Sequence, residues 1–297
     1  MSTPLFSVII PTYNRADKLR RALDSLAAQT FRDFEVIVCD DGSTDDSREV
    51  AVEFEKKILL TYLWEENWGG PARPRNRGLA VAQGVWVCFL DADDWWYANK
   101  LERVTEQLGT ADVLYHDCDI RTPYGGNALG KHSRQMKAPV FGDLMTNGCT
   151  LVTSGVVMRS SILKGMGGFD EERNLIAVED YDLWLRTAIE TERFHHIPEV
   201  LGTYWSDDSN ISTFSEKYIE REKAVFARHA HKLSPADYRE AEILLTYKIG
   251  LAKRSMGAFK ESRQYFRSCL GSRNIRRKMY ASLYYVLSFI GSKWLLG

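Results

Sequence analysis

The sequence predicts an α/β fold in which a mainly parallel central sheet has helices on both faces, followed by a C-terminal all-helical extension. Two patterns support this prediction. In the first part of the chain, short apolar runs rich in β-branched residues alternate with segments of helical periodicity, an order typical of a parallel sheet covered on both sides. After residue 214 only helical periodicity is left. We therefore expect one domain over 1–213 and a basic helical region over 214–297.

The first four strands are expected where the apolar runs are densest, at 5–10, 34–39, 59–64 and 85–90. Between the first two runs, Leu19, Leu23 and Leu26 repeat at helical spacing, and 72–83 is also helix-like. Strands that alternate with helices in this way favour parallel pairing, because each helix carries the chain back across the sheet.

Beyond the fourth strand the pattern is less regular. The region 121–150 is rich in Gly, Asn, Thr and Lys, which predicts a long loop with little regular structure. A turn is expected at 167–171. The other elements expected are strands at 112–116, 151–158 and 197–204, and helices at 179–189, 215–231, 235–254, 258–270 and 275–290.

Composition places the chain among globular proteins, with 44% hydrophobic and 27% charged residues in a length of 297. The five cysteines are odd in number and widely spaced, without a C-x-x-C pair, as expected in a reducing compartment. The N-terminus has no signal-peptide pattern. These features predict a cytoplasmic protein.

The net charge of -1 conceals a difference between the two ends of the chain. From Ser215 onward there are 17 Lys and Arg residues against 7 Asp and Glu, which leaves about −11 for the rest. The acidic body argues against nucleic acid as a partner, because a phosphate backbone would be repelled. The basic end is suited to an anionic partner.

The residues that directly follow the expected strands carry the most chemistry. Ligands of open parallel sheets bind beyond the carboxyl ends of the strands. Three such segments stand out, at 11–15 (PTYNR), 40–46 (DDGSTDD) and 91–96 (DADDWW). Two of them are acidic clusters, whose mutual repulsion has to be offset by cations or hydrogen-bond donors.

Asp91, Asp93 and Asp94 directly follow an apolar strand. Carboxylates packed this closely favour a hard divalent cation such as Mg²⁺ or Mn²⁺, particularly where a substrate diphosphate supplies further oxygen ligands. The alternative is a solvated acidic turn that caps the next helix. The local sequence leaves both interpretations open.

Tyr13 and Asp41 follow different strands and have the chemistry of a nucleobase pocket. The ring can stack on a base, and the carboxylate can accept from a base N–H group. Helix capping by Ser43 and its acidic neighbours accounts for most of the second cluster but leaves Asp41 unexplained. There is no G-x-G-x-x-G or Walker A sequence, so dinucleotide and P-loop sites are not predicted.

Six segments, in this order, resemble family 2 glycosyltransferases of the A-type fold. They are SVIIPTYNR (7–15), VCDDGSTDD (38–46), NWGGPARPRNRGL (67–79), FLDADD (89–94), GGFDE (167–171) and AVEDYDLWLR (177–186). The resemblance covers roughly residues 5–205. Enzymes of this family transfer a sugar from a nucleotide sugar with inversion, so the resemblance implies a nucleotide-sugar-binding catalytic domain over 1–213.

The resemblance also implies which residues contact the donor: Pro11, Thr12, Tyr13, Asp41, Arg75, Asn76, Asp91, Ala92 and Asp93. The first three would line the nucleoside pocket, and Asp41 would contact the base. Asp91 would face the ribose or the sugar, and Asp93, with Asp91 beside it, would hold Mn²⁺ or Mg²⁺. Such a cation offsets the charge that develops on the diphosphate leaving group.

The resemblance assigns Asp180 as the base that takes the proton of the attacking hydroxyl group. Glu179, Trp95 and Trp184 are expected on the acceptor side. By local pattern alone, Glu179 and Asp180 are ordinary acids of a helix start, and Trp184 fits a core position. One departure is the segment 204–207 (YWSD), where many relatives have an Arg and a His after the Tyr.

We therefore predict a metal-dependent glycosyltransferase that uses a nucleotide sugar, with UDP favoured by the resemblance, to build a polysaccharide on a glycan or lipid-linked acceptor. A nucleotide-sugar-binding protein without turnover and a sugar nucleotidyltransferase are the alternatives. The aromatic stretch 279–297 follows a basic run. This pattern is compatible with peripheral contact with the anionic inner face of a membrane or with a packed terminal helix.

Overall fold

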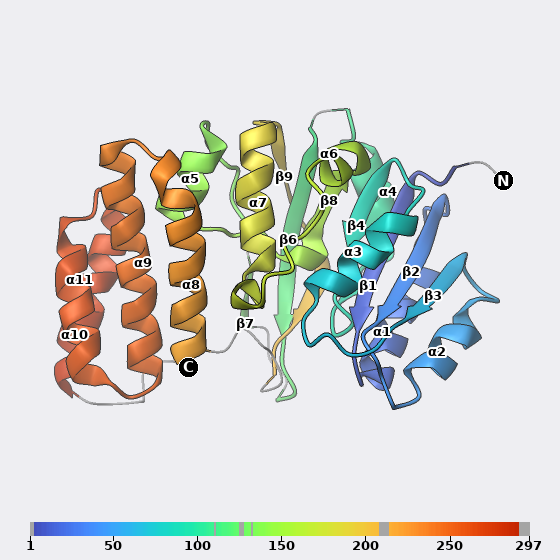
Figure 1. Ribbon diagram of the computed structural model, residues 1–297, viewed down its shortest axis with the longest axis horizontal. Coiled ribbons are helices and arrows are strands. Elements are labelled where there is room, and N and C mark those ends of the chain that lie inside the picture. The colour runs from blue at the N-terminus through green and yellow to red at the C-terminus, as the bar shows by residue number, and fades with distance from the viewer. Residues whose placement is uncertain (1–2, 110, 125–127, 132, 208–213, 291–297) are drawn as a thin grey trace. The chain divides into compact units, whose positions relative to one another are not determined.

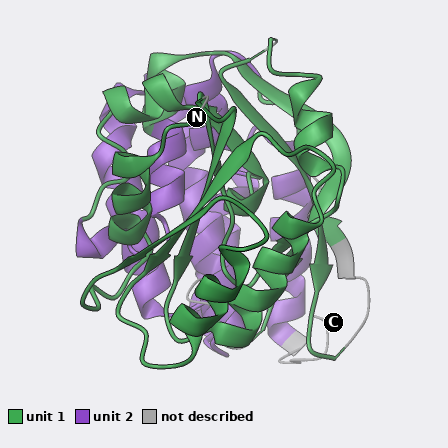
Figure 2. Ribbon diagram, turned by 90° about the vertical axis from the view of Figure 1, so that its right-hand side faces the viewer, with its two compact units in different colours: residues 1–136, 150–171, 186–209 green, residues 137–149, 172–185, 210–297 purple. Residues whose placement is uncertain are grey.

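The computed structural model describes residues 3–109, 111–124, 128–131, 133–207 and 214–290 (Figure 1). By their contacts, the residues form two compact units, which are coloured separately in Figure 2. Unit 1 comprises 1–136, 150–171 and 186–209, and unit 2 comprises 137–149, 172–185 and 210–297. Both units are therefore discontinuous in the chain. The domain boundary expected after residue 213 stays a prediction.

Unit 1 is built on a sheet that has nine strands within the described ranges, in the order β3-β2-β1-β4-β8-β6-β9-β5, with β7 paired to β6. The strands are β1 Phe6–Thr12, β2 Phe34–Asp40, β3 Leu60–Trp64, β4 Trp86–Phe89, β5 Trp95–Trp96, β6 Val113–Arg121, β7 Ala128–Lys131, β8 Val156–Arg159 and β9 Phe194–Trp205. The first four strands are parallel, as are β6 and β9, whereas β8 is antiparallel to both of its neighbours. The predicted, mainly parallel sheet is confirmed.

Helices cover both faces of this sheet. They are α1 Ala16–Ala27, α2 Ser47–Phe54, α3 Ala72–Val81, α4 Lys100–Thr105 and α6 Ser160–Gly165. Val8 of β1 belongs to the same apolar cluster as Leu23 of α1 and Phe54 of α2. Ile9, the next residue, faces α3 instead, where a Cβ on Gly78 would lie 2.7 Å from its Cγ2. Successive strand residues point to opposite faces, so β1 is covered by helices on both sides.

Unit 2 is helical, as expected for the C-terminal region. Its helices are α5 Val140–Asn147, α8 Glu216–His229, α9 Pro235–Ser255, α10 Phe259–Ser268 and α11 Ile275–Ile290, together with the first part of α7 Glu179–Glu190. Ser215 and Ser234 cap α8 and α9, because their hydroxyl groups accept from the backbone N–H of Tyr218 and Asp237. None of the described helices is both long and apolar enough to cross a membrane.

Two expectations about local structure were wrong. The region 121–150 was expected to be a loop, but it contains β7 and α5. The first pairs with β6, and the second buries Val140 and Leu144, so both depend on tertiary contacts rather than composition. The strand expected at 151–158 is present only in its second half, because a short 3-10 turn occupies Thr153–Gly155.

Candidate active site

The carboxyl ends of β1, β2 and β4 lie side by side, because the three strands are parallel and β1 is in the centre. Thr12, the last residue of β1, is paired in register with Asp40, the last residue of β2. The segments 11–15, 40–46 and 91–96 therefore meet at one edge of the sheet in unit 1. This is the edge where parallel sheets bind their ligands.

The first two of these segments are joined by hydrogen bonds. Asn14 has a left-handed backbone with φ of 49°, a conformation that Asn tolerates better than most residues. Its N–H donates to Ser43 Oγ at 2.8 Å, and its Oδ1 accepts from the Thr44 N–H at 2.8 Å. These bonds fix the turn that leaves Tyr13 46% exposed, so its ring is available to stack on a ligand.

Asp40 and Asp41 are both buried, but their carboxylates serve different neighbours. Asp40 Oδ2 accepts from the Tyr62 hydroxyl group at 2.6 Å, which makes it part of the sheet. The Asp41 carboxylate holds the segment before α3, since Oδ1 accepts from the Trp68 N–H at 3.1 Å and Oδ2 from the Gly69 N–H at 2.9 Å. The predicted base contact thus also has a structural task.

Asp91 and Asp93, the two predicted metal contacts, each pair with an arginine. Arg75 Nη2 lies 2.6 Å from Asp91 Oδ1, and Arg15 forms an ion pair with Asp93. Burial raises the pKa of Asp93, and the nearby Asp91 carboxylate raises it further, whereas Arg15 opposes the shift. Among the residues that the structure describes, no group of three His, Cys, Asp or Glu could hold a metal ion.

Asp94 was counted in the acidic motif but given no role by the sequence. It is 1% exposed, and its carboxylate accepts from Ser154 Oγ and, at 2.7 Å, from the Trp205 N–H. Burial, together with the charges of Asp91 and Asp93, raises the pKa of Asp94 well above its ordinary value. Its contacts tie the end of β4 to the end of β9.

Arg75 and Asn76 are adjacent on α3 but have different surroundings. Arg75 is 3% exposed and lies with its guanidinium carbon 5.1 Å from the centre of the Phe169 ring. Asn76 Oδ1 accepts from the Phe169 N–H and its Nδ2 donates to the Phe169 carbonyl, both at 2.8 Å. Gly168 leaves room for this amide, because a Cβ there would collide with Asn76 Oδ1. Asn76 therefore positions the segment 167–171.

The sequence missed three cations at this edge: Arg15, Lys18 and Arg21. Arg15 ends the segment 11–15, and Lys18 and Arg21 lie in the first turns of α1, but none of the three was assigned a role from the sequence. Arg21 lies between two indole rings, with its guanidinium carbon 4.1 Å from the centre of Trp95 and 4.5 Å from that of Trp205. Trp95, predicted on the acceptor side, therefore already stacks on a protein cation.

The predicted base and its neighbours belong to unit 2, at the first turn of α7. Asp180 Oδ1 accepts from the Tyr181 N–H at 2.7 Å, and Asp182 is completely buried with its Oδ1 2.8 Å from His229 Nε2. Glu179 is 4% exposed. Trp184 has no exposed surface, which matches the alternative that it is a core residue rather than an acceptor contact.

Backbone strain precedes this turn. Ala177 has a φ of 70°, a left-handed conformation that costs an ordinary L-residue roughly 1–2 kcal/mol. Strained residues of this kind persist where the surrounding structure fixes them and are concentrated at functional sites. The strain is therefore independent support for a functional role of the segment that begins α7.

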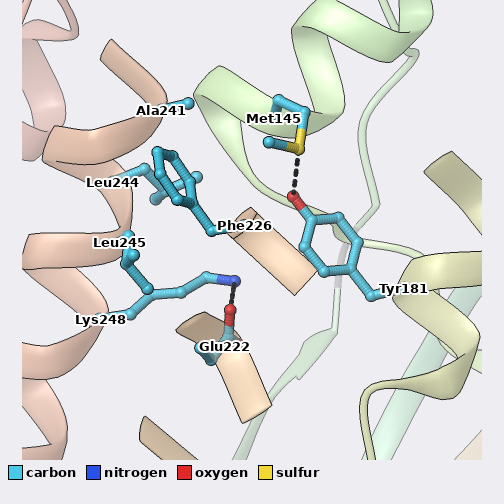
Figure 3. Close-up of a pocket in the computed structure, with 8 residues that line it drawn as sticks. All are labelled: Met145, Tyr181, Glu222, Phe226, Ala241, Leu244, Leu245 and Lys248. Atoms are coloured by element: carbon cyan, nitrogen blue, oxygen red, sulfur yellow. Dashed lines mark hydrogen bonds and ion pairs between the residues drawn. The ribbon is translucent and has the colours of Figure 1, made fainter. Parts of the chain in front are cut away.

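A small pocket of unit 2 lies beside Tyr181 (Figure 3). Its empty volume is about 260 Å³, and it is lined by residues of α5, α7, α8 and α9. The only charges among its lining residues belong to Glu222 and Lys248, whose Oε2 and Nζ are 2.7 Å apart. The Tyr181 hydroxyl group donates to the Leu144 carbonyl at 3.0 Å. Because its polar groups already pair with one another, we interpret the lining of this pocket as packing that stabilises the first turn of α7.

Comparison with known proteins identifies the family. Residues 7–164 match the family described as Glycosyl transferase family 2. The putative teichuronic acid biosynthesis glycosyltransferase TuaG of Bacillus subtilis is 43% identical over 81% of this chain and 90% of its own length. The UDP-Glc:alpha-D-GlcNAc-diphosphoundecaprenol beta-1,3-glucosyltransferase WfgD of Escherichia coli is 31% identical over 62% of this chain and 70% of its own. The chain spans 73% and 58% of uncharacterized glycosyltransferases of Rickettsia typhi and Rickettsia prowazekii.

Solved structures show the same fold. S. aureus TarS residues 1–349 in complex with UDP-GlcNAc superimpose with a TM-score of 0.68 at 21% identity, over 96% of this chain and 89% of that one. The mannosyltransferase PcManGT of Pyrobaculum calidifontis, in complex with GDP-Man and Mn2+, has a TM-score of 0.60 at 18% identity, over 100% and 89%. The chain therefore belongs to glycosyl transferase family 2 and is a nucleotide-sugar glycosyltransferase of the A-type fold.

Proposed function

We propose that this enzyme transfers a sugar, with inversion, from a UDP-sugar to a hydroxyl group of a glycan or lipid-linked acceptor during polysaccharide synthesis. One arrangement carries the proposal: exposed Tyr13 stands at the same sheet edge as Asp91 and Asp93, each paired with an arginine. The names of TuaG and WfgD support a polymeric or lipid-linked acceptor. UDP is supported by WfgD and by the TarS complex.

The nucleoside is expected at the ends of β1 and β2. Tyr13 would stack on the base beside Pro11, and the Thr12 hydroxyl group is buried without a hydrogen-bond partner among the described residues, so it is ready to bind a ligand atom. An ionised carboxylate has about four acceptor positions. Asp41 Oδ1 accepts from the Trp68 N–H, and its second lone pair is proposed to accept from a base N–H group.

Mn²⁺ or Mg²⁺ fits the donor set at the end of β4. Two carboxylates, Asp91 and Asp93, on either side of buried Ala92, suffice for a cation whose remaining ligands are diphosphate oxygens and water. The fold is shared with a mannosyltransferase that was solved with Mn2+. Such a cation supplies positive charge to the leaving diphosphate. Arg75 would add a second positive charge beside the diphosphate, because its guanidinium is held against Asp91.

Asp180 is proposed as the base. The acceptor hydroxyl oxygen attacks the anomeric carbon while its proton passes to the Asp180 carboxylate, and the electron pair of the broken C–O bond goes to the diphosphate oxygen. The Tyr181 N–H holds one carboxylate oxygen of Asp180 in place. The buried pair of Asp182 and His229 fixes the turn that carries it. Glu179 beside it is proposed to shape the acceptor side.

The decisive experiment follows nucleoside diphosphate release from a panel of nucleotide sugars with Mn²⁺ and candidate acceptors. Asp180→Asn should lower transfer by about 100- to 10,000-fold while donor binding is kept. Asp93→Asn should weaken donor binding as well. Glu190→Gln, at the exposed far end of the same helix, is the control and should keep activity. Unchanged transfer in Asp180→Asn would remove the base assignment.

The same assay separates the alternatives. A sugar nucleotidyltransferase would release pyrophosphate from a nucleoside triphosphate rather than nucleoside diphosphate from a nucleotide sugar. A protein that binds nucleotide sugars without turnover would bind the donor and release no product with any acceptor. Either outcome would contradict the proposed reaction.

We further propose that α11 contacts an anionic membrane surface from one side. Its exposed apolar residues recur every three or four positions, as expected for one face of a helix. Each is at least half exposed: Ile275, Met279, Leu283, Val286 and Phe289. Residues 259–290 contain seven Lys or Arg against one Glu, and Arg276 and Lys278 are exposed. Basic charge beside an apolar face favours the interface of anionic lipid.

Cosedimentation with vesicles tests this contact. The full chain should pellet with vesicles that contain phosphatidylserine and much less with neutral phosphatidylcholine vesicles. Leu283→Gln combined with Val286→Gln should abolish pelleting, whereas Ile189→Gln, an exposed apolar residue outside α11, should not. Equal pelleting of the α11 double variant and the unmodified chain would overturn the proposal.

A further inference from the structure

Three cationic side chains lie along one side of the α1 segment. Arg15 directly precedes the helix, and Lys18 and Arg21 follow at intervals of three residues, a spacing that places neighbours on one face. Arg20 lies on another side of the same helix and pairs with Glu53 at the surface. Arg15, Lys18 and Arg21 therefore form a row of positive charge, and Arg20, outside this row, is a control position on the same helix.

Two members of this row pair with acidic residues of the site and remain accessible. Arg15 forms an ion pair with Asp93, and Lys18 Nζ lies 2.7 Å from Asp207 Oδ2. About a quarter of each cationic side chain is exposed, 27% for Arg15 and 26% for Lys18. A charged ligand can therefore reach both groups from solvent.

Arg21, the third member, is fixed from both sides. Besides its two indole neighbours, its Nη2 donates to the Asp93 carbonyl at 2.6 Å. Trp205, one of those indoles, donates from Nε1 to Asp207 Oδ2 at 2.7 Å. Arg21 thus holds together the end of β9 and the end of β4, and in doing so it keeps the acidic partners of Arg15 and Lys18 in position.

Carboxylates and cations alternate around the ends of β4 and β9. Four carboxylates, those of Asp91, Asp93, Asp94 and Asp207, stand with four cations, those of Arg15, Lys18, Arg21 and Arg75. The segment that follows β9, Ser206 and Asp207, contributes no cation. The described cations that pair with these carboxylates therefore belong to the α1 segment and to α3.

We propose that Arg15 and Lys18 bind the diphosphate of the donor and stabilise the negative charge that develops on it as the bond to the sugar breaks. This inference rests on the proposed function. Guanidinium and ammonium groups form strong charge-assisted hydrogen bonds with phosphate oxygens. In the free protein the carboxylates of Asp93 and Asp207 hold the two cations at the site. Arg21 is a positioning residue that maintains this arrangement.

Calorimetric titration with UDP and with uridine, each with and without Mn²⁺, tests the proposal. Arg15→Ala and Lys18→Ala should each weaken UDP binding by about 10- to 100-fold, with uridine binding unchanged, because uridine has no phosphate. Arg15→Lys should recover part of the loss, since it keeps the charge but not the planar fork. Arg20→Ala removes a charge from the same helix and should change neither affinity.

Loss of the diphosphate contact and loss of donor binding as a whole give different results in these titrations. UDP binding at the original affinity in both Arg15→Ala and Lys18→Ala would overturn the inference while leaving the function intact. A parallel loss of uridine binding would also overturn it, because the residues would then be structural. Failure of the unmodified chain to bind UDP, GDP or dTDP would contradict the proposed function itself. Thermal melts check that each variant is folded. Lys18→Ala is expected to disturb the fold less than Arg15→Ala, because the Asp207 side chain that it leaves behind is in contact with solvent.

Discussion

The sheet edge of unit 1 buries charge, whereas α11 of unit 2 exposes apolar surface. Asp93 and Asp94 are 6% and 1% exposed, while Ile275 and Met279 are about two thirds exposed. Both arrangements are costly and both are informative, since buried polar groups and exposed apolar patches are the departures that mark function. The contrast is consistent with the two partners proposed above, a nucleotide sugar at the sheet edge and an anionic membrane surface at α11.

Buried titratable groups in unit 1 are of two kinds. The carboxylates at the end of β4 have donors or cations around them. Lys100 lies deeper, fully buried with its Nζ 3.4 Å from the centre of the Trp96 ring and no hydrogen-bond partner in the part of the chain described. His116 is also buried, and its Nε2 lacks a described partner. These two groups are expected to cost stability rather than to serve the site.

The largest change in stability is expected at Arg277, the buried cation of α11. Arg277 is 6% exposed and its Nη1 lies 2.6 Å from Glu240 Oε1. Arg277→Ala should lower the free energy of unfolding by about 3 kcal/mol, because it removes the close cation of the buried Glu240 carboxylate and leaves it with Arg273, whose Nε is 3.7 Å away. Arg276→Ala, its exposed neighbour, should change it by less than about 0.5 kcal/mol. Urea denaturation measures both, and equal losses would contradict the burial argument.

The second prediction concerns acid stability. Burial lowers the pKa of His116 to about 3, below the ordinary value of about 6.5. Between these values the unfolded chain binds a proton that the folded chain does not, so stability falls with decreasing pH by up to about 1.4 kcal/mol per unit. In His116→Gln this contribution should be missing. The free energy of unfolding, measured by urea denaturation, should then decrease less between pH 6.5 and pH 4 than in the unmodified chain. His231→Gln, at an exposed position, controls for the loss of an imidazole.

Lys100→Met should raise the free energy of unfolding at pH 7 by about 1–3 kcal/mol, because it removes a buried ammonium that forms no ion pair in the described part of the chain and keeps the volume of the side chain. Burial lowers the pKa of Lys100, so the unmodified chain gains stability as pH rises and the difference should shrink toward alkaline pH. Lys57→Met, where the ammonium lies over Phe54 at an exposed position, is the control. A destabilised Lys100→Met protein would show that the cation stabilises unit 1.

The smallest effect is expected on the exposed face of α11. Leu283→Gln with Val286→Gln should change the free energy of unfolding by less than about 0.5 kcal/mol, since both side chains are at least half exposed. Chemical denaturation measures this. A clear loss of stability would mean that this face of α11 is packed in solution, which would contradict the contrast between buried charge in unit 1 and exposed apolar surface in unit 2.

Much of the fold was predictable because its local patterns agree with its tertiary contacts. Leu19, Leu23 and Leu26, spaced for one face of a helix, are completely buried. The helix expected at 275–290 has these bounds. By contrast, β7 and α5 were missed because pairing with β6 and burial within unit 2, rather than their composition, stabilise them.

The site was predictable where a motif carries its own chemistry and unpredictable where the partner is distant in sequence. The strand order alone predicted that the segments 11–15, 40–46 and 91–96 lie at one sheet edge, whereas the roles of Asp91 and Asp93 came from the family resemblance and stay predictions. The task of Asn76 depends on Phe169, 93 positions later. Lys18 meets Asp207 across 189 positions. No local rule predicts pairs of this kind, so the row of cations on α1 became visible only in the structure.

The discontinuity of the two units limits how the protein can be dissected. The chain passes from one unit to the other at 136–137, 149–150, 171–172, 185–186 and 209–210. A fragment that begins at residue 214 would lack α5 and the first turn of α7. Within unit 2, Arg277 of α11 donates to the Thr146 carbonyl of α5, so deletion of the last helix would expose a polar group buried in an earlier segment. Side-chain substitutions, and not truncations, are therefore the means by which the roles of the two units can be told apart.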